Sequence, residues 1–280
     1  MITVPERWSY IECYLTLRCS FGCRWCINAS NINLIRKRKE LTAREWIIAL
    51  NNLDTHGLPV TLGGGEPTMH PEFYPVVNGT EQKFDLLTNG SFDVSKFLKN
   101  TKPDQFYKSK EKHYKSIRIS FHPGYSEQEK ILNVAKRLND AGYSAGIFGT
   151  SYPENLRFNN EFTEMASMAG IFFFIRDYLG WYENRLMGDY YYPNALNGHK
   201  KKCKCRTSEL LVDPTGTIYR CHADLYEEKT AIGNILNMAF DLTDEFMPCD
   251  RYGTCNFCDI KRKLGPDLKS SRCSVEIIEA

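Results

Sequence analysis

Three cysteines stand close together near the start of the chain, at Cys19, Cys23 and Cys26. They follow an apolar run directly, so a single loop could bring all three thiolates around one compact metal group. A structural zinc site, or an iron–sulfur cluster ligated entirely by protein, needs four such ligands. Three thiolates leave one metal position open, and an open position is what chemistry at a metal requires.

A second segment with chemical potential is Gly64-Gly65-Glu66-Pro67, which ends another short apolar run. Glycines let the backbone approach a ligand closely, and a carboxylate beside strand-end carbonyl groups suits an ammonium ion. Read alone, the segment could be a glycine turn with a surface glutamate. Its place at the end of a second expected strand, after such a cysteine loop, favours ligand binding.

Alternating strand and helix patterns over residues 10–185 must position these two loops. Short, continuously apolar strands separated by helices are typical of a parallel sheet covered on both faces. We therefore predict an α/β fold, a partial (β/α)6 TIM-like barrel whose site lies at the carboxyl ends of its strands. A capping box of Thr42 and Glu45 marks the first helix. The expected strands are 10–17, 59–62, 84–88, 116–121, 143–148 and 171–175, and the expected helices are 41–53, 127–140 and 161–168.

With Trp25 in the aromatic position, the loop reads C-x3-C-x-aromatic-C, and residues 9–185 resemble the radical S-adenosylmethionine (SAM) superfamily. The resemblance implies a 4Fe-4S cluster on the three cysteines and SAM at its open iron. It also implies reductive cleavage of SAM to a 5′-deoxyadenosyl radical, which abstracts a hydrogen atom from a substrate carbon. The implied SAM-binding residues are Trp25, Gly64, Gly65, Glu66, Pro67, Asn89, Ser120, His122, Gly146 and Phe148. Several of these, and Arg176, could equally be turn residues or satisfied polar groups at strand ends.

The C-terminal part contains seven of the eleven cysteines around an expected hairpin at residues 210–219. Its pattern resembles the SPASM/twitch extension of radical SAM enzymes, which holds an auxiliary 4Fe-4S cluster. A zinc ribbon is the alternative, because two cysteine pairs around a hairpin also suit zinc. The expected domains are residues 1–185, a connector at 186–202, and residues 203–280. The expected ligands are Cys205, Cys221, Cys255 and Cys258, with Cys203, Cys249 and Cys273 as possible substitutes.

Two further features have open interpretations. Cys13, on the first expected strand, could be a buried small hydrophobic residue or a hydrogen-atom donor that quenches a substrate radical. The aromatic segment 178–192 could line the substrate cavity or join the two parts of the chain.

Composition restricts the setting in which such chemistry occurs. The chain has 280 residues, 42% of them hydrophobic, and a net charge of +2. Such a charge gives no reason to expect nucleic acid, and no apolar run is long enough to span a membrane. An odd number of cysteines is a poor disulfide framework and suits a reducing compartment. We expect a cytoplasmic protein.

Three functions compete. The first is a radical SAM oxidoreductase that modifies a peptide or protein by oxidation, cross-linking or epimerisation. The second is a radical SAM dehydrogenase or epimerase of a small molecule such as a sugar, aminocyclitol or nucleoside. The third is a non-catalytic iron–sulfur or zinc scaffold, which the intact cysteine triad and GGEP segment disfavour. The first two require an electron donor of the flavodoxin or ferredoxin type, and the peptide interpretation is preferred by analogy.

Overall fold

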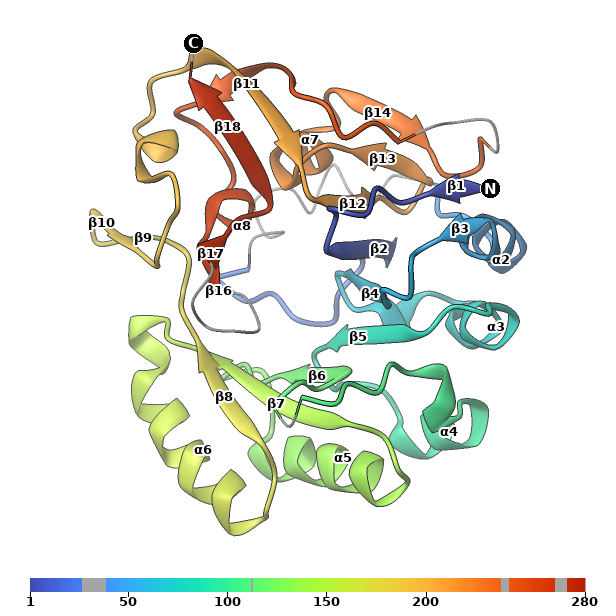
Figure 1. Ribbon diagram of the computed structural model, residues 1–280. Helices are drawn as coiled ribbons and strands as arrows, with labels where there is room; N and C mark the ends of the chain where they lie inside the picture. Colours follow the sequence, from blue (N-terminus) through green and yellow to red (C-terminus); the bar gives the residue numbers. More distant parts are fainter. Residues whose placement is uncertain (27–38, 112, 238–241, 265–270, 280) are drawn as a thin grey trace.

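A nine-stranded sheet organises the molecule, with the order β14-β13-β12-β2-β4-β5-β6-β7-β8 (Figure 1). The computed structural model describes residues 1–26, 39–111, 113–237, 242–264 and 271–279. Neighbouring strands from β2 to β8 pair in parallel, as the sequence predicts. Their bounds are β2 (Tyr10–Thr16), β4 (Val60–Gly64), β5 (Phe84–Thr88), β6 (Ile117–Ser120), β7 (Ala145–Thr150) and β8 (Phe173–Arg176).

Helices cover one side of this sheet, which we call the outer face (Figure 1). Thr42 caps α2 through the predicted capping box with Glu45. The helix expected at 161–168 begins earlier, at Leu156, and two helices between β4 and β6 were not predicted. The helices are α2 (Ala43–Asn51), α3 (Phe73–Gly79), α4 (Val94–Asn100), α5 (Gln128–Asp140) and α6 (Leu156–Met168).

The two faces of the sheet differ in polarity because successive side chains of a strand point to opposite faces. Ile11 and its register partner Val60 belong to the hydrophobic core under the helices. The opposite side, the inner face, presents Glu12, Thr61 and Asp85 in one row across β2, β4 and β5. All three are buried polar residues. The inner face is therefore a polar surface at the centre of the fold.

The predicted C-terminal hairpin extends the main sheet. β12 (Glu209–Val212) pairs with β13 (Thr217–Tyr219), which pairs with β14 (Ala231–Asn234). β12 also pairs in parallel with β2, so Leu211 lies opposite Glu12. Leu210, Val212 and Ile218 join the same core as the helices. The C-terminal part thus shares both sheet and core with the N-terminal part.

A second, three-stranded sheet lies beside the first (Figure 1). It places β11 (Lys201–Thr207) between β15 (Met247–Tyr252) and β18 (Val275–Glu279). Two short helices, α7 (His222–Glu227) and α8 (Phe257–Ile260), pack near it and contact each other. Residues of β11, β15, β18 and both helices form a smaller hydrophobic cluster, which includes Cys203, Cys221 and Tyr252.

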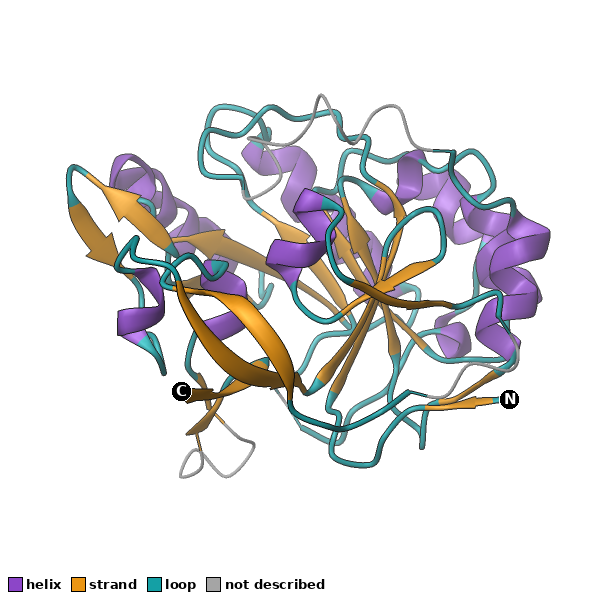
Figure 2. Ribbon diagram, turned by 90° about the horizontal axis from the view of Figure 1, so that it is seen from above, coloured by secondary structure: helices purple, strands orange, loops and turns teal. Residues whose placement is uncertain are grey.

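The described part of the chain also contains three two-stranded sheets. The hairpin of β9 (Gly180–Tyr182) and β10 (Arg185–Met187) projects from the body of the molecule in both views (Figures 1 and 2). Its turn residues Glu183 and Asn184 have φ angles of 46° and 63°, which match the twist of a tight hairpin. The other pairs are β1 (Ile2–Thr3) with β3 (Leu53–Asp54) and β16 (Lys263–Leu264) with β17 (Ser271–Arg272). Within the described residues, no helix is long and apolar enough to cross a bilayer.

Candidate functional site

The cysteine loop and the GGEP segment are joined through their backbones at the carboxyl ends of β2 and β4. The N–H of Gly65 donates to the Thr16 carbonyl (3.0 Å), and the N–H of Glu66 donates to the Arg18 carbonyl (2.7 Å). A Cβ atom at position 65 would lie 2.2 Å from the Arg18 oxygen. Because only glycine allows this approach, Gly65 fixes the loop that begins at Cys19.

Glu66 anchors the site from beneath. Its side chain is fully buried and accepts hydrogen bonds from the Thr68 N–H (3.2 Å) and hydroxyl (2.6 Å). It also accepts from the Thr88 hydroxyl (2.9 Å) and the Asn89 N–H (2.7 Å). Burial raises the pKa of Glu66, and these donors oppose the rise. The carboxylate therefore ties the GGEP segment to the end of β5, rather than facing solvent as a surface glutamate would.

Asn89 reaches from the end of β5 to the first cysteine. Its side-chain nitrogen lies 3.6 Å from the sulfur of Cys19 and 3.1 Å from the hydroxyl of Ser20. The N–H of Phe21 also donates to the Cys19 sulfur, at 3.4 Å. Amide donors of this kind stabilise cluster thiolates and tune their reduction potential. The donor set thus fits a thiolate-bound iron–sulfur cluster.

The other two cysteines follow in the same loop, where the N–H of Cys26 donates to the Cys23 carbonyl (3.1 Å). Burial raises the pKa of Cys19, and it raises the pKa of Cys23 to about 12. A coordinated metal reverses this effect because it deprotonates the thiols that bind it. Among the described residues, no three metal-ligating side chains converge closely enough for a single metal ion. A cubane cluster suits the loop better, because it binds each thiolate at a separate iron.

Aromatic rings form a wall beside this loop. Trp25 stacks against His122 with ring centroids 6.0 Å apart, and it contacts Tyr152 at 5.2 Å. Burial lowers the pKa of His122 to about 4, so its ring is neutral near pH 7. The buried Nε1 of Trp25 and Nδ1 of His122 have no hydrogen-bond partner among the described residues. These two atoms are available to a ligand.

The remaining predicted SAM-binding residues have mixed positions. Ser120 and Phe148 are register partners on the inner face, near the carboxyl ends of β6 and β7. Gly146 has a packing reason, because a Cβ there would lie 2.7 Å from the Lys115 side chain. Pro67 is buried at the start of a short 3-10 helix (Pro67–Met69). That any of these four residues contacts SAM stays a prediction.

Three of the C-terminal cysteines meet across β11 and β15. Cys203 is the register partner of Cys249, and Cys205 lies two residues further along the same face of β11. The thiol of Cys205 shares a hydrogen bond with Cys249, which lowers the pKa of Cys249 to about 6 and raises that of Cys205. Cys203 and Cys249 therefore belong to the same group of thiols as Cys205. Sequence reasoning had treated both only as substitutes.

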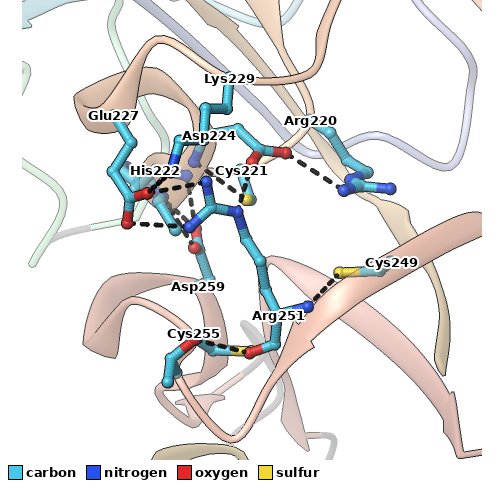
Figure 3. Close-up of polar contacts among 12 residues, drawn as sticks. Arg220, Cys221, His222, Asp224, Glu227, Lys229, Cys249, Arg251, Cys255 and Asp259 are labelled. Atoms are coloured by element: carbon cyan, nitrogen blue, oxygen red, sulfur yellow. Dashed lines mark hydrogen bonds and ion pairs between the residues drawn. The ribbon is translucent and has the colours of Figure 1, made fainter. Parts of the chain in front are cut away.

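The other C-terminal cysteines lie in helices and loops, and Figure 3 shows two of them, Cys221 and Cys255. Cys221 caps α7, and its sulfur accepts from the Asp224 N–H at 3.4 Å. Cys255 follows β15, and Cys258 lies in α8. Cys273 instead donates to the Val275 carbonyl at 2.6 Å and lines a separate cavity of about 240 Å³ with Arg7 and Tyr192.

Buried ion pairs brace this cysteine group (Figure 3). Asp224, fully buried in α7, accepts from Arg251 at 2.6 Å and from Arg220 at 3.2 Å. Arg251 also forms a bidentate pair with Glu227, at 2.9 and 3.1 Å. Each buried charge thus has an opposite partner, as buried charges require.

His222 links the cysteine group to the main sheet. Its Nδ1 lies 2.7 Å from Asp259, and its Nε2 lies 3.9 Å from Glu12 on the inner face. Burial alone would lower the pKa of His222, but the charge and hydrogen bond of Asp259 raise it well above its ordinary value. Sequence reasoning missed this residue, although its place directly after Cys221 was a usable signal.

Cys13 points away from the site. It lies in the hydrophobic core with Ile11 and Leu15, on the helix-covered outer face. Burial raises the pKa of its thiol. The structure therefore favours a buried small hydrophobic residue over the hydrogen-atom donor, because a donor must face the substrate.

Some aromatic side chains of the segment 178–192 pack inside the protein, and others are exposed to solvent. Tyr178 and Tyr182 pack edge-on against Tyr152, at 4.9 and 5.4 Å, and so extend the wall that begins at Trp25. Tyr190 is buried in the smaller hydrophobic cluster. Trp181 is 53% exposed at the projecting hairpin. The segment thus touches both the site and the C-terminal part.

Comparisons with known proteins agree with this geometry. No family model matches the chain. Over 86 residues the chain is 29% identical to an S-adenosylmethionine-dependent nucleotide dehydratase of Selenomonas ruminantium, a match that covers 29% of this chain and 30% of that protein. Over 204 residues it is 24% identical to the molybdenum cofactor biosynthesis protein moc-5 of Caenorhabditis elegans, covering 62% of this chain. The chain thus spans about a third of the length of each curated relative.

Two solved structures have a similar fold. One is anSMEcpe with bound AdoMet and the Cp18Cys peptide, with a TM-score of 0.54 and 15% identity over 82% of this chain and 78% of that one. The other is SuiB of Streptococcus suis bound to the precursor peptide SuiA, with a TM-score of 0.57 and 16% identity over 82% and 63%. At this identity the likeness establishes the fold, and the predicted resemblance to radical SAM enzymes is confirmed at that level.

Proposed function

We propose that this chain is a radical SAM enzyme that uses SAM to abstract a hydrogen atom from a substrate carbon. The observation that supports this most is the backbone connection between the cysteine loop and the GGEP segment, held from below by buried Glu66. The connection brings a three-thiol loop and a ligand-binding turn together at the carboxyl edge of a parallel sheet. That edge is where ligands bind in folds of this class.

The residues of the loop have defined tasks in this proposal. Cys19, Cys23 and Cys26 hold a 4Fe-4S cluster, and the amide of Asn89 supports the first thiolate. A cluster bound there would supply one electron to the sulfonium of SAM, which would break the C5′–S bond and give methionine and a 5′-deoxyadenosyl radical. The GGEP backbone receives the methionine amine, and Trp25 and His122 shield the site from water.

A peptide or protein is the proposed substrate. Structures of similar fold that contain bound peptides, such as those of anSMEcpe and SuiB, support this choice. Oxidation, cross-linking and epimerisation are all compatible with hydrogen abstraction. A small molecule is the second candidate, and a specific observation favours it. The inner face is polar and charged, with Glu12, Asp85 and Arg118 among its residues.

The C-terminal cysteines hold an auxiliary 4Fe-4S cluster in this proposal. The candidate ligands are Cys205, Cys221, Cys255 and Cys258. The pairing of Cys203 with Cys249 supports counting these two cysteines among the candidates as well. The part from residue 203 onward then acts as a twitch-like unit on a partial (β/α)6 barrel at 1–185, joined by the connector 186–202. A flavodoxin or ferredoxin-type protein in the cytoplasm supplies the electrons.

Anaerobic reconstitution tests the proposal. We expect about eight iron atoms per chain, from two cubane clusters, and formation of 5′-deoxyadenosine from SAM with dithionite. Replacing Cys19, Cys23 and Cys26 together by alanine should abolish cleavage and leave about four iron atoms. If the intact protein binds about four iron atoms and one zinc ion, the C-terminal site is a zinc ribbon. If it forms no 5′-deoxyadenosine, the chain is a scaffold and the proposed activity is wrong.

A further inference from the structure

Two arginines, Arg118 and Arg176, lie on the inner face, and one of them has no acidic partner among the described residues. Arg118 on β6 is the register partner of Gly146, and Arg176 at the end of β8 is the partner of Thr150. Phe148 lies between these two levels on β7 and shares the same face. Arg176 therefore stands at the carboxyl edge of the sheet, the edge that also holds the cysteine loop.

Arg118 is fixed in place by its neighbours. Its Nη2 lies 3.0 Å from Asp85, and its guanidinium lies 5.9 Å from the ring centroid of Tyr114. Its side chain is only 15% exposed, and its buried Nε has no hydrogen-bond partner among the described residues. Asp85 therefore does not use the Nε–H of this guanidinium.

Arg176 has a different environment. Its guanidinium stacks 4.5 Å from the ring centroid of Phe148, and no carboxylate pairs with it among the described residues. The side chain is exposed to solvent, yet desolvation and the nearby charge of Arg118 lower its pKa to about 10. The side chain thus stacks on the ring of Phe148 and is open to solvent. Phe174, beside it on the inner face, is 53% exposed.

Arg176 differs in this respect from three other arginines. Arg220, Arg251 and Arg7 each pair with at least one carboxylate. Asp85 compensates the charge of Arg118, so the charge that is left for an anion on the inner face is that of Arg176. A planar guanidinium stacked on an aromatic ring is also preorganised to bind a carboxylate or phosphate through two hydrogen bonds.

We propose that Arg176, with Arg118 behind it, binds an anionic group of the substrate, either a carboxylate or a phosphate. The proposal rests on the proposed function, and it narrows the substrate to one with an anionic group that enters the inner face. The group would be held at the same edge as the site of radical formation. The carboxylate of SAM has the same chemistry and is the other possible occupant, so the experiment must distinguish the two.

Binding of simple anions to the reconstituted protein, saturated with SAM, tests the proposal without knowledge of the substrate. The probes are inorganic phosphate and succinate, measured by calorimetry at low salt. We compare Arg176→Gln, Arg176→Lys and a control, Arg157→Gln, which alters an exposed arginine of α6 paired with Glu161. At least one probe should bind the unaltered protein and the control equally. Its affinity should fall about tenfold or more in Arg176→Gln and less in Arg176→Lys, because lysine keeps only the point charge.

Three outcomes would overturn the assignment. The first is that neither anion binds the unaltered protein. The second is that Arg176→Gln binds both as well as the control does. The third is that Arg176→Gln weakens SAM itself about tenfold in equilibrium dialysis, which would make the SAM carboxylate the occupant. Failure of the radical function is a separate result, because it appears as absent 5′-deoxyadenosine while anion binding is intact.

Discussion

Replacing Glu66 by glutamine tests the hydrogen bonds that hold the site together. The two carboxylate oxygens face different backbone donors, the N–H of Thr68 on one side and the N–H of Asn89 on the other. Neither N–H can act as an acceptor. A glutamine amide has one oxygen and one NH₂ group, so in either orientation its NH₂ group opposes a backbone N–H. The Thr88 hydroxyl accepts from the Gly90 N–H at 3.0 Å and has a second lone pair for the NH₂ group, but that bond would still leave the opposed backbone N–H without an acceptor.

The expected loss follows from two contributions. One charge-assisted hydrogen bond is lost, which costs about 1.5–3 kcal/mol, and one buried backbone N–H loses its acceptor, which costs about 1–3 kcal/mol. Together they lower the free energy of unfolding by about 2.5–6 kcal/mol, a large part of the stability of a typical domain. The Asn89 amide that supports Cys19 should also shift, so the affinity for SAM should fall in parallel.

Urea unfolding of the reconstituted protein, followed by circular dichroism under anaerobic conditions, measures the effect. Glu45→Gln is the matched control, because the same change falls on an exposed capping box that accepts glutamine as readily as glutamate. Its unfolding midpoint should stay near that of the unaltered protein. If Glu66→Gln unfolds within about 1 kcal/mol of the unaltered protein, Glu66 is protonated in the fold and the assigned donors are wrong.

Three further predictions concern other parts of the site. Gly65→Ala should abolish SAM binding, because the new Cβ would lie 2.2 Å from a backbone oxygen. Gly22→Ala is the control and should still bind SAM, because its Cβ would have no atom within 4 Å. Equal SAM affinities of the two variants in equilibrium dialysis would contradict this prediction. Cys249→Ser should lower iron from about eight to about four atoms per chain while Cys273→Ser leaves it unchanged; the reverse result would move the auxiliary site toward β18. The pKa of His122 is lowered from 6.5 to about 4, so the unfolded chain takes up this proton first as the pH falls. The free energy of unfolding should therefore drop by up to about 3 kcal/mol between pH 6.5 and 4, and His122→Gln should remove that drop in acid titrations followed by circular dichroism.

Local patterns predicted the main sheet well, because the residues that form each strand and each helix cap are neighbours in the sequence. The strand expected at 84–88 matches β5 (Phe84–Thr88), and Thr42 caps α2 as its capping box indicates. The expected strand at 171–175 is displaced to Phe173–Arg176. That displacement matters, because it makes Arg176 the last strand residue, with its side chain on the inner face.

Pairings between distant segments could not be read in the same way. Nothing in residues 209–212 indicates that β12 would pair with β2 at the other end of the chain, because such pairing depends on which strand edge the fold leaves open. The same limit explains the auxiliary ligands. Spacing favoured Cys205 over Cys203 and Cys249, whereas the register of β11 against β15 places Cys203 opposite Cys249. For the same reason, the sequence did not predict that His222 would lie beside Asp259 and Glu12.

The two cysteine groups belong to one packed structure. Tyr14 on β2 and Tyr226 on α7 stack with ring centroids 6.5 Å apart, and both are almost fully buried. Tyr14 lies on the strand that leads into the first cysteine group, and Tyr226 lies on the helix that Cys221 caps, so this tyrosine pair joins the two groups. Removing the C-terminal part would expose the paired edge of β2, a strand that is buried along nearly its whole length. The loop that begins at Cys19 continues from that strand. The geometry of the first cysteine group therefore depends on the part of the chain that holds the second.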